Sequence, residues 1–257
     1  MNRMLVRQMI RENLYIAIGY FVLLTIALLA AVLYWPELRD NVPVLIKLVP
    51  FDKLKGWVQQ MEQEGYWPYF VVQQFFKGCS LFGLAAAALI GSGMVAREAD
   101  QNTAEFLLSR PVSRRRVLLV RWAVGVVMLA VPVFLSSIAG WAVSVAIDEK
   151  VSFVATMICA AYLSLFLMTL FSFTAWMSAG ATHQLRPGVT LVGITLLMFA
   201  LYLVKVANKL SIFMMVDHEV LVPIRDGIYP WGRAAIFVIA SGVLLYGALR
   251  RFEARDF

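Results

Sequence analysis

The side chains best placed to do chemistry in this sequence lie between Arg97 and Arg121. This stretch, READQNTAEFLLSRPVSRRRVLLVR, holds nine ionisable residues, six of them basic, and it separates two long apolar runs. Such residues cap helices and pair charges, while the apolar tip Phe106-Leu107-Leu108 is suited to contact with another protein. The chemistry that these residue types indicate is docking.

Capping signals divide the charged stretch into two helices. Asn102 can cap a helix, and Glu105 stands where a capping-box partner reaches back to it. The short helix at 103–109 ends before Pro111, because the residue before a proline is pushed toward extended geometry. Ser113 can then cap the helix that follows. A helix of fewer than two turns is marginal in water, so it needs a partner.

An ordinary cytoplasmic loop is the alternative interpretation of these residues. In that case the arginines at 110, 114, 115 and 116 only fix the topology and bind anionic lipid. Composition alone leaves both interpretations open.

Outside this stretch, the sequence offers no catalytic pattern. It contains no H-E-x-x-H and no Ser/His/Asp set, and neither of its two histidines lies in the middle of an apolar run. Asp217-His218-Glu219 are metal-type ligands, but three adjacent residues cannot close a tetrahedral shell alone. Cys79 and Cys159 fall within apolar runs and are expected to be buried thiols. An enzyme and a metal site are therefore both disfavoured.

Composition and charge spacing indicate a membrane protein. Hydrophobic residues make up 61% of the chain and charged residues 15%, against roughly 45–50% and about 25% in a soluble domain. A helix crosses hydrocarbon with about 20 apolar residues, whereas the alternation of a spanning strand is absent. Six charge-free runs reach or approach the helical length: Asn13–Pro36, Gly78–Ala96, Trp122–Ile147, Val151–Leu185, Pro187–Val204 and Ala234–Leu249. The predicted fold class is an all-α integral membrane protein with six transmembrane helices.

These runs predict a single transmembrane domain over residues 1–257, with spans at about 14–34, 69–95, 117–147, 151–180, 189–205 and 231–249. Residues 1–12 place Arg3, Arg7 and Arg11 on one helical face, which favours an interfacial helix; a disordered basic tail is the alternative. An amphipathic helix after Pro50 is expected to rest on the outer surface. Residues 207–230 are irregular and are expected to re-enter the membrane in part.

The distribution of charge predicts the orientation. Six spans place both termini and the charged stretch on one side, which carries 13 Lys/Arg and 6 Asp/Glu, whereas the remainder of the chain carries 10 of each. Basic residues near span ends favour the cytoplasmic side. The termini are therefore predicted to be cytoplasmic, and the net charge of +7 needs no nucleic-acid partner.

The second predicted span carries two sets of residues suited to contacts within the membrane. At its outer end, polar side chains on one face are expected to avoid lipid and to line a translocation path: Gln73, Gln74 and Lys77. The alternative is that Lys77 snorkels to the outer headgroups. Further inward, small residues recur every four positions and form a ridge that lets another helix approach closely: Gly83, Ala87 and Gly91.

Residues 97–114, R-E-A-D-Q-N-T-A-E-F-L-L-S-R-P-V-S-R, resemble the pattern R-E-x-E-x-G-T-x-E-x-L-L-x-x-P-x-S-R of the ABC-2 type permease family, the membrane subunits of ATP-binding-cassette exporters. The ending F-E-A-R-D at 252–256 is similar to the F-x-x-R-D of the branch that contains the nitrous-oxide-reductase maturation permease. Asp100 and Asn102 depart from the pattern, but Asn tolerates a left-handed backbone nearly as well as glycine.

The resemblance implies that 97–116 is a coupling segment, whose helix at 103–109 docks in a groove of an ABC ATPase subunit. The residues assigned to this contact are Arg97, Glu98, Asp100, Asn102, Thr103, Glu105, Phe106, Leu107, Leu108, Ser109, Arg110, Pro111, Ser113 and Arg114. The chain has no G-x-x-x-x-G-K-[ST], so the ATPase is expected to be a separate polypeptide that uses ATP and Mg, and this chain is expected to bind no cofactor.

By the same resemblance, two copies of the chain form the pore, with spans two and five along the dimer path. The expected function is export across the bacterial cytoplasmic membrane, with membrane lipid as a further partner. A secondary transporter or channel that works without an ATPase is the alternative. Such proteins usually carry intramembrane acids or broken helices in paired halves, and the sequence shows neither.

Overall fold

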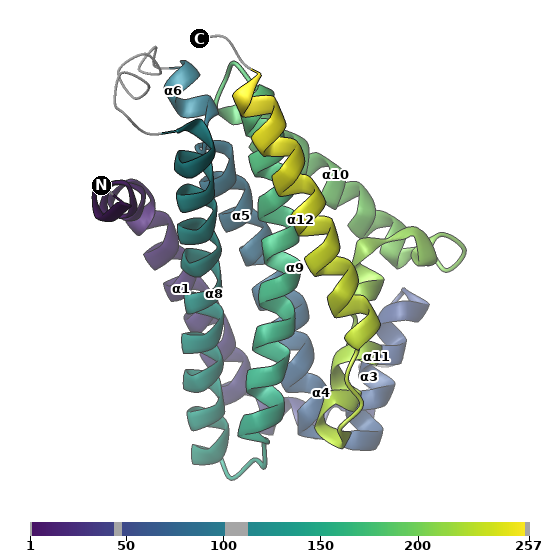
Figure 1. Ribbon diagram of the computed structural model, residues 1–257. Helices are drawn as coiled ribbons and strands as arrows, with labels where there is room; N and C mark the ends of the chain where they lie inside the picture. Colours follow the sequence, from purple (N-terminus) through teal and green to yellow (C-terminus); the bar gives the residue numbers. More distant parts are fainter. Residues whose placement is uncertain (1, 44–47, 101–112, 255–257) are drawn as a thin grey trace.

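Long helices that run between two ends of the molecule make up the structure (Figure 1). The computed structural model describes residues 2–43, 48–100 and 113–254, and for 2–5 and 98–99 it describes the backbone alone. Within these ranges there is no β-strand, and six helical stretches are long and apolar enough to cross a membrane: Val6–Arg39, Tyr66–Ser92, Arg114–Ala146, Phe153–Gly180, Leu185–Leu203 and Trp231–Glu253. The predicted all-α fold with six spans is confirmed.

α1 (Asn2–Arg39) is one continuous helix, so no helix end separates residues 2–12 from the first span. Figure 1 shows its first turns nearly end-on and the remainder running along the molecule, which means that the helix changes direction without ending. No proline interrupts this helix before Pro36, and backbone bonding therefore continues through the expected boundary. The interfacial position of the first turns stays a prediction.

The second span differs from its prediction in winding. It consists of α4 (Tyr66–Val71), the π-helix η1 (Val72–Phe82) and α5 (Gly83–Ser92), where one α-helix over 69–95 was expected. In η1 the hydroxyl of Ser80 donates to the carbonyl of Phe75, five residues back, at 3.1 Å. π-helical turns are rare and occur frequently at functional sites.

α8 (Arg114–Ala146) and α9 (Phe153–Gly180) form a long helical hairpin. Ser113 caps α8 by accepting a hydrogen bond from the backbone N–H of Arg116 at 3.4 Å, as the sequence predicted. Ser152 caps α9 in the same way, with the N–H of Ala155 at 3.3 Å. The turn between them contains Asp148 at φ 61°, a left-handed conformation that Asp tolerates better than most residues.

α10 (Leu185–Leu203) and α12 (Trp231–Glu253) complete the spans. Between them lie only short pieces: η2 (Asn208–Leu210), η3 (Ile212–Met215), α11 (His218–Leu221) and η4 (Val222–Asp226). α3 (Asp52–Glu64), the amphipathic helix expected after Pro50, buries Trp57 and Met61. Figure 1 places α3, α4 and α11 toward the end of the molecule opposite to α6 (Ala96–Asp100).

The ridge of small residues in span two packs against α9 of the same chain. A Cβ on Gly83 would lie 2.6 Å from Leu167 Cδ2, and a Cβ on Gly91 would lie 2.6 Å from Thr174 Cβ. Ala87 between them is fully buried. Because nothing larger than hydrogen fits at either glycine without a shift, the two helices approach closely along this line, as small residues allow inside a membrane.

Candidate functional site

The backbone between α5 and α6 breaks its helical bonding, and α9 supplies the missing partners. The Ser178 hydroxyl donates to the carbonyl of Ser92 at 2.9 Å. The same oxygen accepts from the backbone N–H groups of Val95 at 3.1 Å and Ala96 at 3.0 Å. One hydroxyl therefore joins the last turn of α5 to the first turn of α6.

The guanidinium of Arg121 holds the same break from α8. Its side chain is buried, and Nη1 donates to the carbonyl of Met94 at 2.5 Å. The C-terminal end of a helix carries partial negative charge, which favours a cation there. Span two is thus fixed at its C-terminal end by both α8 and α9, directly before the predicted coupling segment begins.

α6 is also linked to two other parts of the chain by charged groups. Arg97 Nη1 lies 3.4 Å from Glu12 Oε2 of α1, and His183 Nδ1 of the α9–α10 turn lies 3.2 Å from Asp100 Oδ1. The second pair is well exposed to solvent. Exposed pairs contribute about 0–1 kcal/mol, so the buried contacts of Ser178 dominate the anchoring of this end.

The chain is anchored again where it returns at the start of α8. Arg114 Nη1 lies 3.4 Å from the carbonyl oxygens of both Phe252 and Glu253, at the end of α12. In Figure 1, α6, the beginning of α8 and the end of α12 lie at the same end of the molecule. Both flanks of the coupling segment are therefore connected to the helical bundle.

Only part of the predicted coupling set falls within the described residues. The structure gives contacts for Arg97, Asp100, Ser113 and Arg114, as set out above. The side chain of Glu98 lies outside the description, and so do the remaining predicted residues: Asn102, Thr103, Glu105, Phe106, Leu107, Leu108, Ser109, Arg110 and Pro111. The short helix at 103–109 stays a prediction.

The polar residues predicted to share one face of span two are separated by the structure. Gln74 is fully buried, and its Nε2 donates to the hydroxyls of Ser136 at 2.8 Å and Ser137 at 2.9 Å on α8. Gln73 and Lys77 instead line a groove on another side of η1. The π-helical winding moves Gln74 away from the face of Lys77, because three residues complete a smaller part of a turn in a π-helix than in an α-helix.

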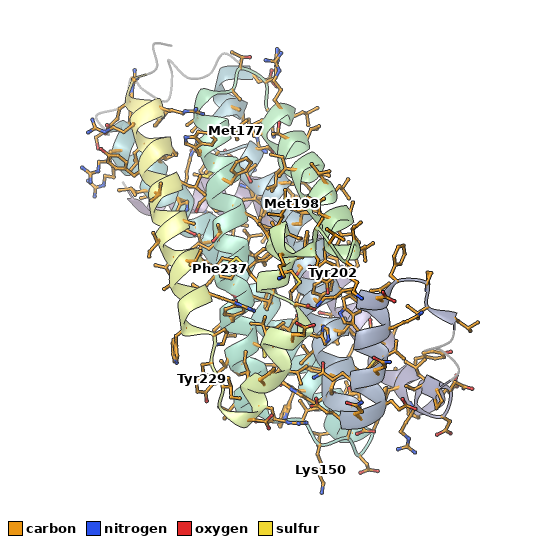
Figure 2. The ribbon with its side chains drawn as sticks, turned by 90° about the vertical axis from the view of Figure 1, so that its right-hand side faces the viewer. Lys150, Met177, Met198, Tyr202, Tyr229 and Phe237 are labelled. Atoms are coloured by element: carbon orange, nitrogen blue, oxygen red, sulfur yellow. The ribbon has the colours of Figure 1, made fainter. Side chains whose placement is uncertain are left out.

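A buried polar network joins α3 to the irregular segment between α10 and α12. Asp217, with no exposed surface, has Oδ2 2.6 Å from Lys53 Nζ and Oδ1 2.6 Å from His218 Nδ1. The hydroxyl of Tyr202 donates to the same Oδ1 at 2.8 Å, and Trp57 Nε1 donates to that hydroxyl at 3.1 Å. Figure 2 shows Tyr202 at the level of Phe237 and away from Met177, which lies near the C-terminal end of α9.

The electrostatics of this network favour the charged forms. Burial works to raise the pKa of Asp217, but hydrogen bonds and charges from His218 and Lys53 outweigh burial and lower that pKa to about 2. Burial likewise works to lower the pKa of Lys53, while its bonds to Asp217 and Glu219 raise it. The role of Asp217, His218 and Glu219 in the structure is thus to hold α3 in place. Among the described residues, no three His, Cys, Asp or Glu side chains come together as a metal site.

Comparison with known protein families decides the class of the molecule. A family model described as "ABC-2 family transporter protein" matches residues 6–257, nearly the whole chain. The chain belongs to the ABC-2 transporter family. It is a multi-pass transport protein of the membrane-component type and is not itself catalytic. No curated protein and no solved structure matches this ABC-2 protein. The match is to the family as a whole, so the likeness of 252–256 to one branch stays a prediction.

Two anchoring residues of this ABC-2 protein were not predicted from the sequence. Ser178 was one of several hydroxyl residues in its span, and Arg121 was one of six basic residues in the charged stretch. The signal for Arg121 was its place inside the predicted third span (117–147), where an ionisable residue is expensive and needs a partner. No comparable signal marked Ser178, because most such hydroxyls bond within their own helix.

Replacing Ser178 with alanine is expected to destabilise the protein. The change leaves the carbonyl of Ser92 and the N–H groups of Val95 and Ala96 without this partner. An unsatisfied buried polar group lowers the free energy of unfolding by about 1–3 kcal/mol. The measurement is the thermal unfolding midpoint of the purified chain in detergent. Ser164→Ala is the matched control, since its hydroxyl bonds only to Ala160 in its own helix. Equal thermal unfolding midpoints for the two variants would contradict the conclusion that Ser178 anchors the break between α5 and α6.

Asp217→Asn is expected to destabilise the protein by about 3 kcal/mol at neutral pH, because it leaves Lys53 without a buried partner. The folded pKa of Asp217 lies below its unfolded value. Its contribution is therefore complete above about pH 4 and is lost as the pH falls toward 2, by roughly 2 kcal/mol. The free energy of unfolding, measured between pH 5 and 2, should fall by this amount in the wild type and by less in Asp217→Asn. The exposed Asp226→Asn serves as control, and a variant as acid-sensitive as the wild type would exclude the ion pair as the cause.

Proposed function

We propose that this chain is the permease subunit of an ABC exporter in the cytoplasmic membrane of a bacterium, with both termini in the cytoplasm. A separate ATPase subunit docks on the helix at 103–109, and ATP hydrolysis there drives export. The observation that carries the proposal is the double anchoring of the coupling segment: Ser178 and Arg121 hold its start, and Arg114 joins its return to the end of α12.

This anchoring supports transmission of force. A flexible loop would absorb a push from a docked ATPase, whereas a segment whose flanks are bonded to buried groups passes the push into spans two, three and four. Interfaces that are packed in this way respond by shifts of whole elements. The distribution of charge supports the orientation, because the described charged side chains at the end that carries α6 and the end of α12 are mostly basic, among them Arg114, Arg115, Arg116, Arg250 and Arg251.

The described spans also argue against a transporter that works alone. The acidic side chains within them lie near their ends, as Glu12 and Glu253 do, and none lies in the middle. Secondary transporters usually carry ionisable groups at the midplane, where they couple ion movement to transport. An external source of energy fits this chain better.

We also propose that two copies pair through α5 and α10. A groove of about 500 Å³ runs between these helices, and small residues are among those that line it, including Ala88, Gly188 and Gly193. Leu89 and Leu196 stand at its edge with more than half of their surface exposed. Membrane helices associate through small residues that allow close approach, so a second copy is a suitable occupant of this face.

Replacing Phe106 and Leu107 together with aspartate is expected to abolish association with a co-expressed ABC ATPase subunit. The apolar tip would have to bury two carboxylates in the ATPase groove, and each buried charge without a partner costs several kcal/mol. The measurement is co-purification of the ATPase on a tag carried by the permease. Leu48→Asp, at an exposed position on the opposite side of the membrane, is the control. Unchanged association of the double variant would place the docking site elsewhere.

Leu196→Cys is expected to give a disulfide-linked dimer when membranes are oxidised. The native Cys79 and Cys159 are buried and free, so a new bond reports on the introduced thiol. Val238→Cys on α12 is the control, because half of its surface is also exposed but it lies on another helix. Dimers are measured by electrophoresis without reductant. Equal cross-linking of both variants, or cross-linking only at 238, would reject the proposed interface.

A further inference from the structure

A groove of about 420 Å³ lies between α1, α3, η1 and α10, on the side of span two where Gln73 and Lys77 are found. We propose that this groove binds an anionic phospholipid, with the headgroup phosphate on Lys77 and an acyl chain along the apolar wall. The proposal does not depend on an ATPase partner or on dimer formation, because it concerns only residues of one chain that the structure describes.

The walls of the groove are suited to an acyl chain. Aromatic and aliphatic side chains contributed by separate elements line it: Leu54, Trp57, Phe76, Leu81, Phe82, Phe199 and Leu203. Leu81 and Phe82 each expose more than a third of their surface, so the groove is reached from the side of the bundle. Its size falls within the range of about 300–1,000 Å³ that ligand pockets show. An apolar wall open toward lipid selects a molecule with an apolar tail.

The charge in the groove selects an anion. Of the described residues that line it, Lys77 alone carries a charge, and its side chain is exposed. Lys53, on the neighbouring α3, is already paired with Asp217 and Glu219. No acidic side chain in the described ranges lies within ion-pair distance of Lys77. A lysine ammonium within a span is costly without a counter-charge, and a phosphate supplies one.

Gln73 adds a second polar group to the same site. It lies four residues before Lys77 and lines the same groove, so its amide can donate to a headgroup oxygen that the ammonium attracts. Lys77 follows Tyr69, near the start of the span, by eight residues, or at most about 12 Å along the helix. This short distance lets a phospholipid place its phosphate on the Lys77 ammonium while its acyl chain follows the groove.

Native mass spectrometry of the full chain in detergent tests the proposal. The protein is titrated with phosphatidylglycerol and with phosphatidylethanolamine of the same acyl chains. The wild type is expected to prefer phosphatidylglycerol by about five- to tenfold, the effect of one lysine at an anionic headgroup, because the ammonium of phosphatidylethanolamine neutralises the phosphate that both lipids carry. Lys77→Gln should remove this preference and Lys77→Arg should keep it, which separates loss of charge from misfolding. Lys150→Gln, at an exposed turn (Figure 2), should leave it unchanged.

Two further arms test the acyl chain and the source of the phosphate. Leu81→Trp, which narrows the groove, should weaken the binding of both lipids. Free glycerol phosphate should not displace phosphatidylglycerol at equal concentration, because it has no tail. A Lys77→Gln variant that keeps the preference would overturn the proposal, and so would a preference lost equally in Lys150→Gln. Displacement by free glycerol phosphate would show a soluble-phosphate site in place of a lipid site.

Discussion

A backbone amide or carbonyl within a lipid bilayer must be satisfied inside the protein, because hydrocarbon offers no hydrogen bonds. Two interruptions of regular α-helix in the described part of the chain obey that constraint. At the break between α5 and α6, Ser178 and Arg121 supply the partners. In the π-helix of span two, Ser80 bonds to a carbonyl five residues back. The interruptions are therefore stable features that the surrounding helices define.

The same constraint gives the two ends of the molecule different mechanical properties. At the end that carries α6, buried hydrogen bonds to backbone groups join α5, α6, α8 and α9 into one unit. At the other end, α3 is held to α11 through side chains, chiefly the pair between Lys53 and Asp217. Between the two ends lies the π-helical part of span two. A force applied at the predicted coupling segment is expected to move the end that carries α6 as one rigid unit. The same force is expected to change the packing at the end that carries α3 and α11.

Much of the fold could be predicted from the sequence. The free energy of transferring a charge-free run of about 20 residues into lipid is large, and it depends only on the residues within that run. The six spans and the cap at Ser113 follow from such local terms. The π-helix could not be predicted, since its winding depends on how Gln74 and its neighbours pack against α8. The partners of Arg121 and Ser178, and Lys53 as a partner of Asp217, lie far away in the sequence, so only the folded arrangement reveals them.

The central claim is that an ATPase moves the anchored cytoplasmic end as a rigid unit, and distances between spin labels test it most directly. A label on Leu185→Cys, an exposed position at the start of α10, reports the distance between two copies in the assembled complex. A chain labelled at position 119 on α8 and at position 182 directly after α9, both of them exposed, and diluted with unlabelled chain reports a distance within the anchored end of one copy. The account predicts that ATP binding shifts the distance between the two copies by more than the width of the distribution measured without ATP. The distance within one copy is expected to stay unchanged. A constant distance between copies, or a change confined to the distance within one copy, would contradict it.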